Sequence, residues 1–140
     1  MIALTEDKRM LGYGVMTPYS NIFCFATTRR GGFSKGDYAS FNCTPYTGDD
    51  AESVRRNQEL LCNSMPQHPK ELVIPFQTHG TKVEVIDEKY LNATSDERTA
   101  MLQGVDALIT KEPGCCICIS TADCIPILLY DCKNQVLSLI

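Results

Sequence analysis

Four closely spaced runs of strand-forming residues make up the last quarter of the chain and constrain its fold more than any other feature. They cover residues 105–110, 115–121, 125–130 and 135–140. The short segments between them contain turn-forming residues, among them Pro113, Gly114 and Asn134. The end of the chain is therefore expected to be rich in β-sheet.

Further strands and one clear helix are expected upstream. Strand-forming runs cover residues 21–28, 72–76 and 82–86, and the last of these alternates polar and apolar residues. A helix is expected to begin at the acidic segment 49–52, with an acceptor at its cap, and to end before Pro66. Its apolar face carries Ala51, Val54, Leu61 and Cys62.

Residues 92–103 are ambiguous between a loop and a short helix. One helix with several strands close in sequence predicts an α+β fold, with mixed β-sheet layers flanked by helices. The length of 140 residues fits a single domain over residues 1–140.

Charge and hydropathy exclude two broad classes of partner. Thirteen basic and seventeen acidic residues give a net charge of 13 − 17 = −4, whereas a nucleic-acid-binding protein shows a basic field. Acidic residues stand where a signal peptide would have its apolar core, and no apolar run is long enough to span a bilayer. We therefore expect a cytoplasmic protein without nucleic-acid or membrane partners.

Eight cysteines in 140 residues are many, but in the cytosol they should stay reduced. Cys115, Cys116 and Cys118 fit a buried strand, on which Cys116 and Cys118 would share one face. Their spacing is not that of the C-x2-C pairs of zinc knuckles. Packing in the core is the expected role for every cysteine except Cys124.

Cys124 and His79 are the two residues best suited to chemistry. Cys124 ends the segment 120–124, where a strand breaks, and His79 lies beside Gly80 between two expected strands. The neighbouring Asp123 would by itself raise the pKa of the Cys124 thiol, whereas a bound metal would deprotonate it. The pair fits either covalent Cys–His chemistry or two ligands of a metal site. Spacing alone does not decide between these readings.

A basic, glycine-containing loop at residues 29–36 is a third candidate site. It matches neither a phosphate-binding P-loop nor a dinucleotide fingerprint. Its guanidinium groups, its hydroxyl and its glycine-freed amides could hold an oxyanion such as phosphate. A solvated turn between strands accounts for the same composition, and Arg30 is expected to face solvent.

Taken together, six ordered motifs resemble the laccase-domain family of bacterial proteins, which are also described as purine nucleoside phosphorylases with adenosine deaminase activity. The resemblance runs from about residue 25 to the end of the chain. The motifs lie at residues 28–36, 38–42, 48–50, 77–80, 105–110 and 121–126.

The resemblance implies a metal site, usually zinc and alternatively copper, with His79 and Cys124 as ligands. The family's third ligand is a histidine in an H-A-G-W-R-G segment, which has no counterpart in these 140 residues. The domain is therefore expected to be truncated on its C-terminal side. Within the same resemblance, Arg29 is the candidate for anion binding, helped by Ser34, while Asn42 and Gln77 are candidates for positioning ribose or base.

The leading hypothesis is a zinc-dependent purine nucleoside phosphorylase with adenosine deaminase activity, which converts inosine or adenosine and phosphate to base and ribose 1-phosphate. His79 and Cys124 would be its catalytic residues, and purine nucleoside and phosphate its partners. Three alternatives stay open: a copper-dependent phenol oxidase, a Cys–His hydrolase in peptidoglycan editing, and a non-catalytic metal-binding module. The sequence predicts no oligomeric state.

Overall fold

The computed structural model describes all 140 residues and divides into two compact units, Met1–His68 and Pro69–Ile140. The first unit contains one β-sheet and the second contains two, and each unit is described by itself. The expectation of one domain over residues 1–140 stays a prediction.

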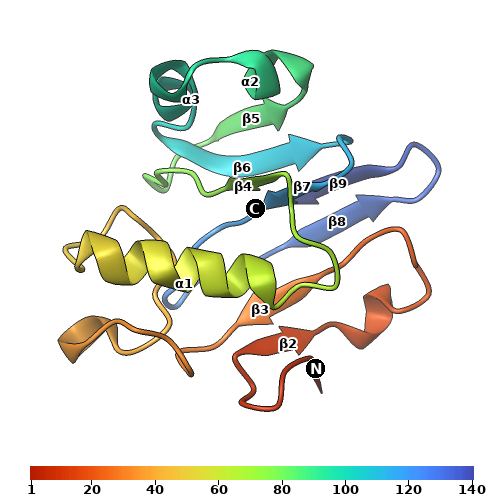
Figure 1. Cartoon of the computed structure of the whole chain (residues 1–140). Helices are drawn as coiled ribbons and strands as arrows, with labels where there is room; N and C mark the ends of the chain where they lie inside the picture. Colours follow the sequence, from red (N-terminus) through yellow and green to blue (C-terminus); the bar gives the residue numbers. More distant parts are fainter. The chain divides into compact units, whose positions relative to one another are not determined.

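The first unit combines a small antiparallel sheet with one long helix (Figure 1). Its sheet has the order β1-β2-β3, and β3 lies within the expected strand at residues 21–28. The sequence patterns did not reveal β1 and β2, which have only two and three residues. The elements of this unit are β1 (Ile2–Ala3), β2 (Met10–Gly12), η1 (Gly14–Met16), β3 (Phe25–Thr27), η2 (Gly36–Tyr38) and α1 (Ala51–Asn63).

Helix α1 forms where the sequence predicts it, and its cap lies at the second of the two aspartates. The Asp50 side chain accepts a hydrogen bond from the Ser53 backbone N–H at 2.9 Å. Asp49 is held elsewhere, because its carboxylate accepts a hydrogen bond from Asn42 Nδ2. The buried residues of α1 are Val54, Asn57, Leu61 and Cys62.

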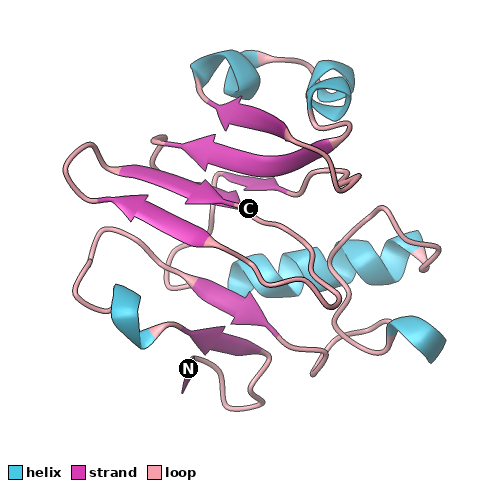
Figure 2. Ribbon diagram, turned by 180° about the vertical axis from the view of Figure 1, so that it is seen from behind, coloured by secondary structure: helices cyan, strands magenta, loops and turns pink.

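The second unit contains a four-stranded mixed sheet of order β5-β6-β9-β8 and a two-stranded parallel sheet of β4 and β7. Figure 2 shows helices α2 and α3 beside β5, which is an edge strand of the larger sheet. The elements are β4 (Glu71–Val73), β5 (Lys82–Ile86), α2 (Glu88–Asn92), α3 (Ser95–Met101), β6 (Val105–Thr110), β7 (Cys115–Ile117), β8 (Leu128–Asp131) and β9 (Val136–Leu139). Mixed sheets with flanking helices confirm the predicted α+β class.

Local chemistry explains where the strands and helices of this unit differ from expectation. The strand expected from residue 125 begins at Leu128, because Pro126 has no N–H for the ladder. The strand expected over 115–121 ends at Ile117, and the Ser120 N–H donates to the Gln77 side chain instead of to a neighbouring strand. The ambiguous region becomes α3 because Thr94 and Glu97 form a capping box at its start.

The core of the second unit is apolar and drawn from both sheets and from the helical segment. Thr110 is the buried polar side chain there, and its hydroxyl donates to the Ile86 carbonyl at 2.7 Å. The core residues are Val73, Ile86, Tyr90, Leu102, Val105, Leu108, Ile117 and Leu139.

None of the eight cysteines is in a disulfide bond. Cys116 and Cys118 share one face as predicted, with their sulfurs 3.7 Å apart. The packing role expected for Cys132 is wrong, since this residue is exposed in the turn between β8 and β9. No helix in the structure is both long and apolar enough to cross a bilayer.

Candidate functional site

The beginnings of three strands meet at one end of the four-stranded sheet. Strands β5 and β6 are parallel, and β8 runs in the same direction because both β6 and β8 are antiparallel to β9. The loop with His79 precedes β5, Asp106 is the second residue of β6, and the segment with Cys124 precedes β8. The segments with the two sequence-predicted metal ligands therefore lie at the same end of the sheet, before its two edge strands, although they are far apart in the chain.

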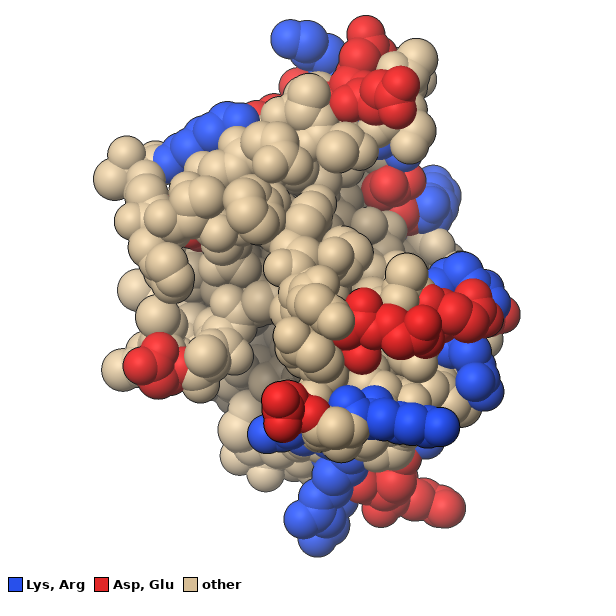
Figure 3. All heavy atoms as spheres, turned by 90° about the vertical axis from the view of Figure 1, so that its left-hand side faces the viewer, with Lys and Arg blue, Asp and Glu red and all other residues tan.

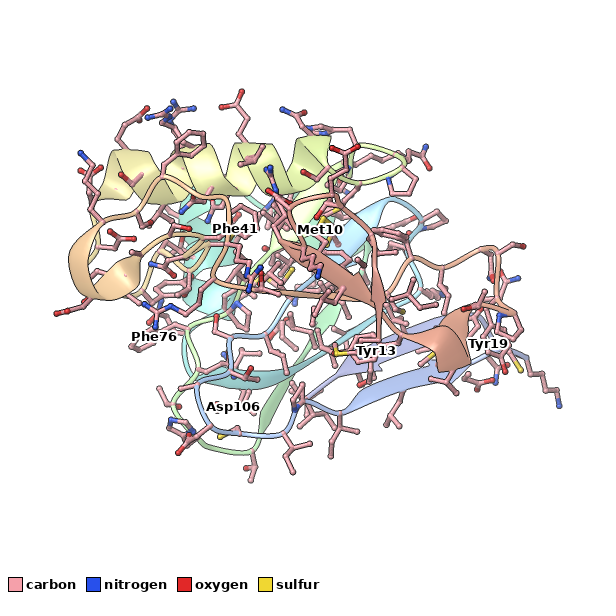
Figure 4. The ribbon with its side chains drawn as sticks, turned by 90° about the horizontal axis from the view of Figure 1, so that it is seen from below. Met10, Tyr13, Tyr19, Phe41, Phe76 and Asp106 are labelled. Carbon is pink, nitrogen blue, oxygen red and sulfur yellow. The ribbon has the colours of Figure 1, made fainter.

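Asp106 organises the loop that carries His79. Its Oδ1 accepts hydrogen bonds from the backbone N–H groups of Thr78 at 3.0 Å and His79 at 2.8 Å, and its Oδ2 accepts one from Gly80 at 2.7 Å. Figure 4 labels Asp106 beside this loop. Three successive amides thus point at one carboxylate, an arrangement that favours an anion.

The hydrogen bonds also set the protonation of Asp106. Desolvation acts to raise the pKa of its carboxyl, but the N–H donors of Gly80, His79 and Thr78 and the nearby His79 side chain outweigh it. The net effect holds the pKa of Asp106 below its ordinary value. The loop is therefore held by a carboxylate that stays ionised at neutral pH.

Gln77 links the His79 loop to the segment that leads to Cys124. Its side-chain Oε1 accepts a hydrogen bond from the Ser120 backbone N–H at 2.7 Å. Gln77 lies two residues before His79, and Ser120 lies four residues before Cys124. One side chain thereby ties together the two segments that carry the predicted ligands.

Both predicted ligands are exposed side chains, one imidazole and one thiol. Nitrogen and sulfur donors of this kind bind zinc or copper, and exposure leaves them accessible to an ion. The structure has no group of three or more His, Cys, Asp and Glu side chains that could hold a metal. An imidazole and a thiol are chemically suited to zinc or copper, and the role of His79 and Cys124 as ligands stays a prediction.

Figure 3 views the molecule from the side on which β5, β6 and β8 begin. Lys, Arg, Asp and Glu side chains of both signs are visible there among uncharged residues.

Arg29, in the first unit, is engaged with the backbone of its own loop. Its Nε donates to the Ala39 carbonyl and its Nη2 to the Asp37 carbonyl, both at 2.9 Å. The side chain is exposed, and neither of these bonds uses Nη1. Arg30 is also exposed, which confirms its predicted place in solvent.

Ser34 and Asn42 are brought together by Asn57 and Asp49, neither of which was predicted as a site residue. Asn57 is fully buried on α1, and its Nδ2 donates to Ser34 Oγ at 2.9 Å and to the Asn42 carbonyl at 2.7 Å. Asn42 Nδ2 and the Ser34 hydroxyl in turn bond to the carboxylate of Asp49. The Ser34 bond is the largest cause of the lowered pKa of Asp49.

These contacts give Ser34 and Asn42 a structural role in holding the loop. Ser34 is only 5% exposed, and an anion that approached its hydroxyl would meet the like charge of Asp49. Their roles in substrate binding stay predictions, as does that of Gln77.

Asp106 and Asn57 are the organising residues that sequence reasoning missed. Asp106 lies in a predicted motif, but nothing in its spacing connects it with His79, 27 residues away. Asn57 had a detectable signal, because it stands three residues after Val54 on the apolar face of α1. A polar residue on a buried face needs hydrogen-bond partners, which Asn57 finds in the loop.

Comparison with known proteins gives concordant results. The family model described as multi-copper polyphenol oxidoreductase laccase matches residues 23–140. A purine nucleoside phosphorylase of Bacteroides thetaiotaomicron is 61% identical over 140 residues, which is all of this chain and 52% of that protein. Adenosine deaminase RL5, from an unknown prokaryotic organism, is 39% identical over 114 residues, covering 81% of this chain and 44% of that protein.

The fold is shared with a solved structure, that of the Bacillus licheniformis hypothetical protein YfiH. The TM-score is 0.80 at 22% identity, over 94% of this chain and 48% of the other. The chain thus spans about half the length of the relatives that it matches.

Proposed function

Because the chain belongs to the multi-copper polyphenol oxidoreductase laccase family, we propose that it contributes two metal ligands to an enzyme that cleaves purine nucleosides with phosphate and deaminates adenosine. The observation that carries the proposal is the 61% identity, over all 140 residues, to a protein named purine nucleoside phosphorylase. The relative named adenosine deaminase supports the second activity.

His79 and Cys124 are the proposed ligands. Cys124 would bind as a thiolate after releasing its proton, and His79 as a neutral imidazole. A bound zinc ion supplies a Lewis acid and lowers the pKa of a water molecule toward ~7. The hydrogen bond between Gln77 and Ser120 supports the assignment, because it joins the two segments from which these ligands come.

Arg29 is the proposed phosphate-binding residue. Two of its guanidinium nitrogens are bound to loop carbonyls, which fixes the side chain while leaving Nη1 for an anion. A guanidinium held in place loses less conformational entropy when it binds phosphate. Replacement by Ala is expected to raise the KM for phosphate more than it changes the KM for the nucleoside.

Zinc is the proposed metal, with copper as the alternative. Copper(II) binds a given set of nitrogen and sulfur ligands more tightly than zinc does, so the donor types do not select zinc by affinity. Metal analysis of the protein purified without added metal distinguishes the two. Zinc at about one ion per site supports the proposal, and stoichiometric copper without zinc contradicts it.

The test of activity uses the metal-loaded full-length protein with inosine or adenosine and phosphate. We expect base and ribose 1-phosphate as products, and loss of both in Cys124→Ser and His79→Ala. Cys132→Ser is the matched control, since Cys132 is equally a free, exposed thiol. An inactive wild-type protein, or full activity in Cys124→Ser, contradicts the proposal.

Phenol oxidation is a second candidate because the matching family is described as a polyphenol oxidoreductase laccase. Oxygen uptake with a phenol, present with copper and absent with zinc, would support it. No uptake in either metal state removes this candidate. If the protein cleaved a peptidoglycan peptide, and if alkylation of Cys124 blocked this cleavage, the result would instead favour the hypothesis of a Cys–His hydrolase.

A further inference from the structure

A set of three hydrogen bonds at this end of the sheet joins a strand residue to the loop of a proposed ligand. Asp106 takes the backbone N–H groups of Thr78, His79 and Gly80 on its two carboxylate oxygens, at 2.7–3.0 Å. Its own backbone is fixed in β6, where neighbouring Val105 and Ala107 are buried. The carboxylate therefore connects a rigid strand to the loop.

We propose that Asp106 is a positioning residue that presets the backbone of His79 for metal binding. The inference rests on the proposed function, in which His79 is a ligand. Asp106 would act without touching the metal, by fixing the amide of His79 and of both its neighbours. The backbone of His79 would then already have the conformation that sets the direction of its Cα–Cβ bond before the metal binds.

The backbone of His79 needs such support. Its φ is +58°, in the left-handed region, which is unfavourable for residues with a Cβ. The three hydrogen bonds to Asp106 hold the loop in this conformation. Gly80 permits the close approach, because a Cβ there would stand 3.3 Å from Asp106 Oδ2.

Variants of Asp106 separate positioning from general stability. In Asp106→Asn one oxygen becomes an NH2 group, so an amide donor replaces an acceptor at one of the three N–H groups. In Asp106→Glu the carboxylate is kept but displaced by one methylene. We expect Asp106→Asn to bind zinc roughly 10–100-fold more weakly than the wild type, as is found when other groups that orient a metal ligand are replaced. Asp106→Glu should recover part of this lost affinity.

Asp131→Asn is the matched control. Asp131 also accepts two backbone N–H groups, from Lys133 and Asn134, and its pKa is also lowered, first by the Asn134 side chain. It lies at the end of β8, whereas Asp106 lies at the beginning of the parallel strand β6. We expect this variant to change zinc affinity by less than about twofold.

The experiment measures zinc affinity of the full-length protein by competition with a chromophoric chelator, with thermal unfolding of the zinc-free protein alongside. His79→Ala is included so that two failures can be told apart. Unchanged affinity in His79→Ala overturns the ligand assignment itself. Reduced affinity in His79→Ala with wild-type affinity in Asp106→Asn overturns the positioning role. Equal losses in Asp106→Asn and Asp131→Asn would show a stability effect only, and would also overturn it.

Discussion

Gln77 accepts a hydrogen bond from the Ser120 backbone N–H at 2.7 Å, across 43 residues of sequence. The bond joins the loop before β5 to the segment that follows β7. The bond gives Gln77 a structural role, because it connects the segment that carries His79 to the segment that carries Cys124.

Replacing Gln77 by Ala should release the segment around Ser120. Ser120 is exposed, so in the variant its N–H can donate a hydrogen bond to water. The free energy of unfolding should therefore fall by only about 0.5–1.5 kcal/mol. Hydrogen exchange of the Ser120 amide should become much faster. In Gln77→Glu, which keeps an acceptor oxygen, the Ser120 amide should exchange as slowly as in the wild type. Unchanged exchange in Gln77→Ala would mean that the bond does not hold this segment.

Replacing Asn57 by Ala should destabilise the first unit strongly. The Phe33 N–H and the Asn42 carbonyl would lose their Asn57 partner beside a buried helix face, while the Ser40 carbonyl would keep its bond from the Ser34 N–H. We expect a loss of about 2–4 kcal/mol in the free energy of unfolding, measured by urea denaturation. Asn63→Ala, at the exposed end of the same helix, should stay within about 0.5 kcal/mol of wild type. Equal losses in both variants would contradict the role of Asn57.

The contribution of Asp49 should depend on pH in one direction. Hydrogen bonds, first that of Ser34, lower the pKa of Asp49 in the folded protein below its unfolded value of about 3.9. The carboxylate therefore stabilises the fold above pH ~4, and this stabilisation is lost as pH falls through the folded pKa. The difference in urea midpoint between wild type and Asp49→Asn should be full at pH 7 and shrink toward pH 3. A difference that is constant over this range would refute the assignment.

A half-buried and an exposed thiol should differ in reactivity. Burial, with a contribution from Cys62, raises the pKa of the Cys43 thiol to about 12. Cys132 is exposed, and no comparable burial protects it. Iodoacetamide at pH 8 should therefore label Cys132 well before Cys43 in the folded protein, with equal labelling in denaturant, as followed by peptide mass spectrometry. Early labelling of Cys43 in the folded protein would contradict its burial.

Strong local patterns predicted much of the fold. Strands β5 and β6 have the predicted bounds, because alternating residues mark β5 and a continuous strand-forming run marks β6. The two-residue β1 carries too little pattern to be detected. Elsewhere, the observed strand boundaries differ from the predicted ones where a single residue limits strand pairing, as Pro126 does before the start of β8.

The candidate site was predictable as residue types but not as a network. His79 and Cys124 stand out by chemistry, and the sheet brings their segments to one end. The contacts made by Asp106 and Gln77 cross 27 and 43 residues of sequence, and such distances leave no periodic signal. They become visible only when the register of the strands is known.

Protection of Cys124 by zinc tests the central claim, that this thiol and His79 bind a metal, most directly. The full-length protein is alkylated with iodoacetamide with and without zinc, and Cys132 in the same molecule serves as the reference thiol. We predict that zinc slows alkylation of Cys124 by more than about tenfold and leaves Cys132 unchanged, because a coordinated thiolate is no longer free to react. His79→Ala should remove the protection. Alkylation of Cys124 at the same rate with and without zinc would contradict the claim.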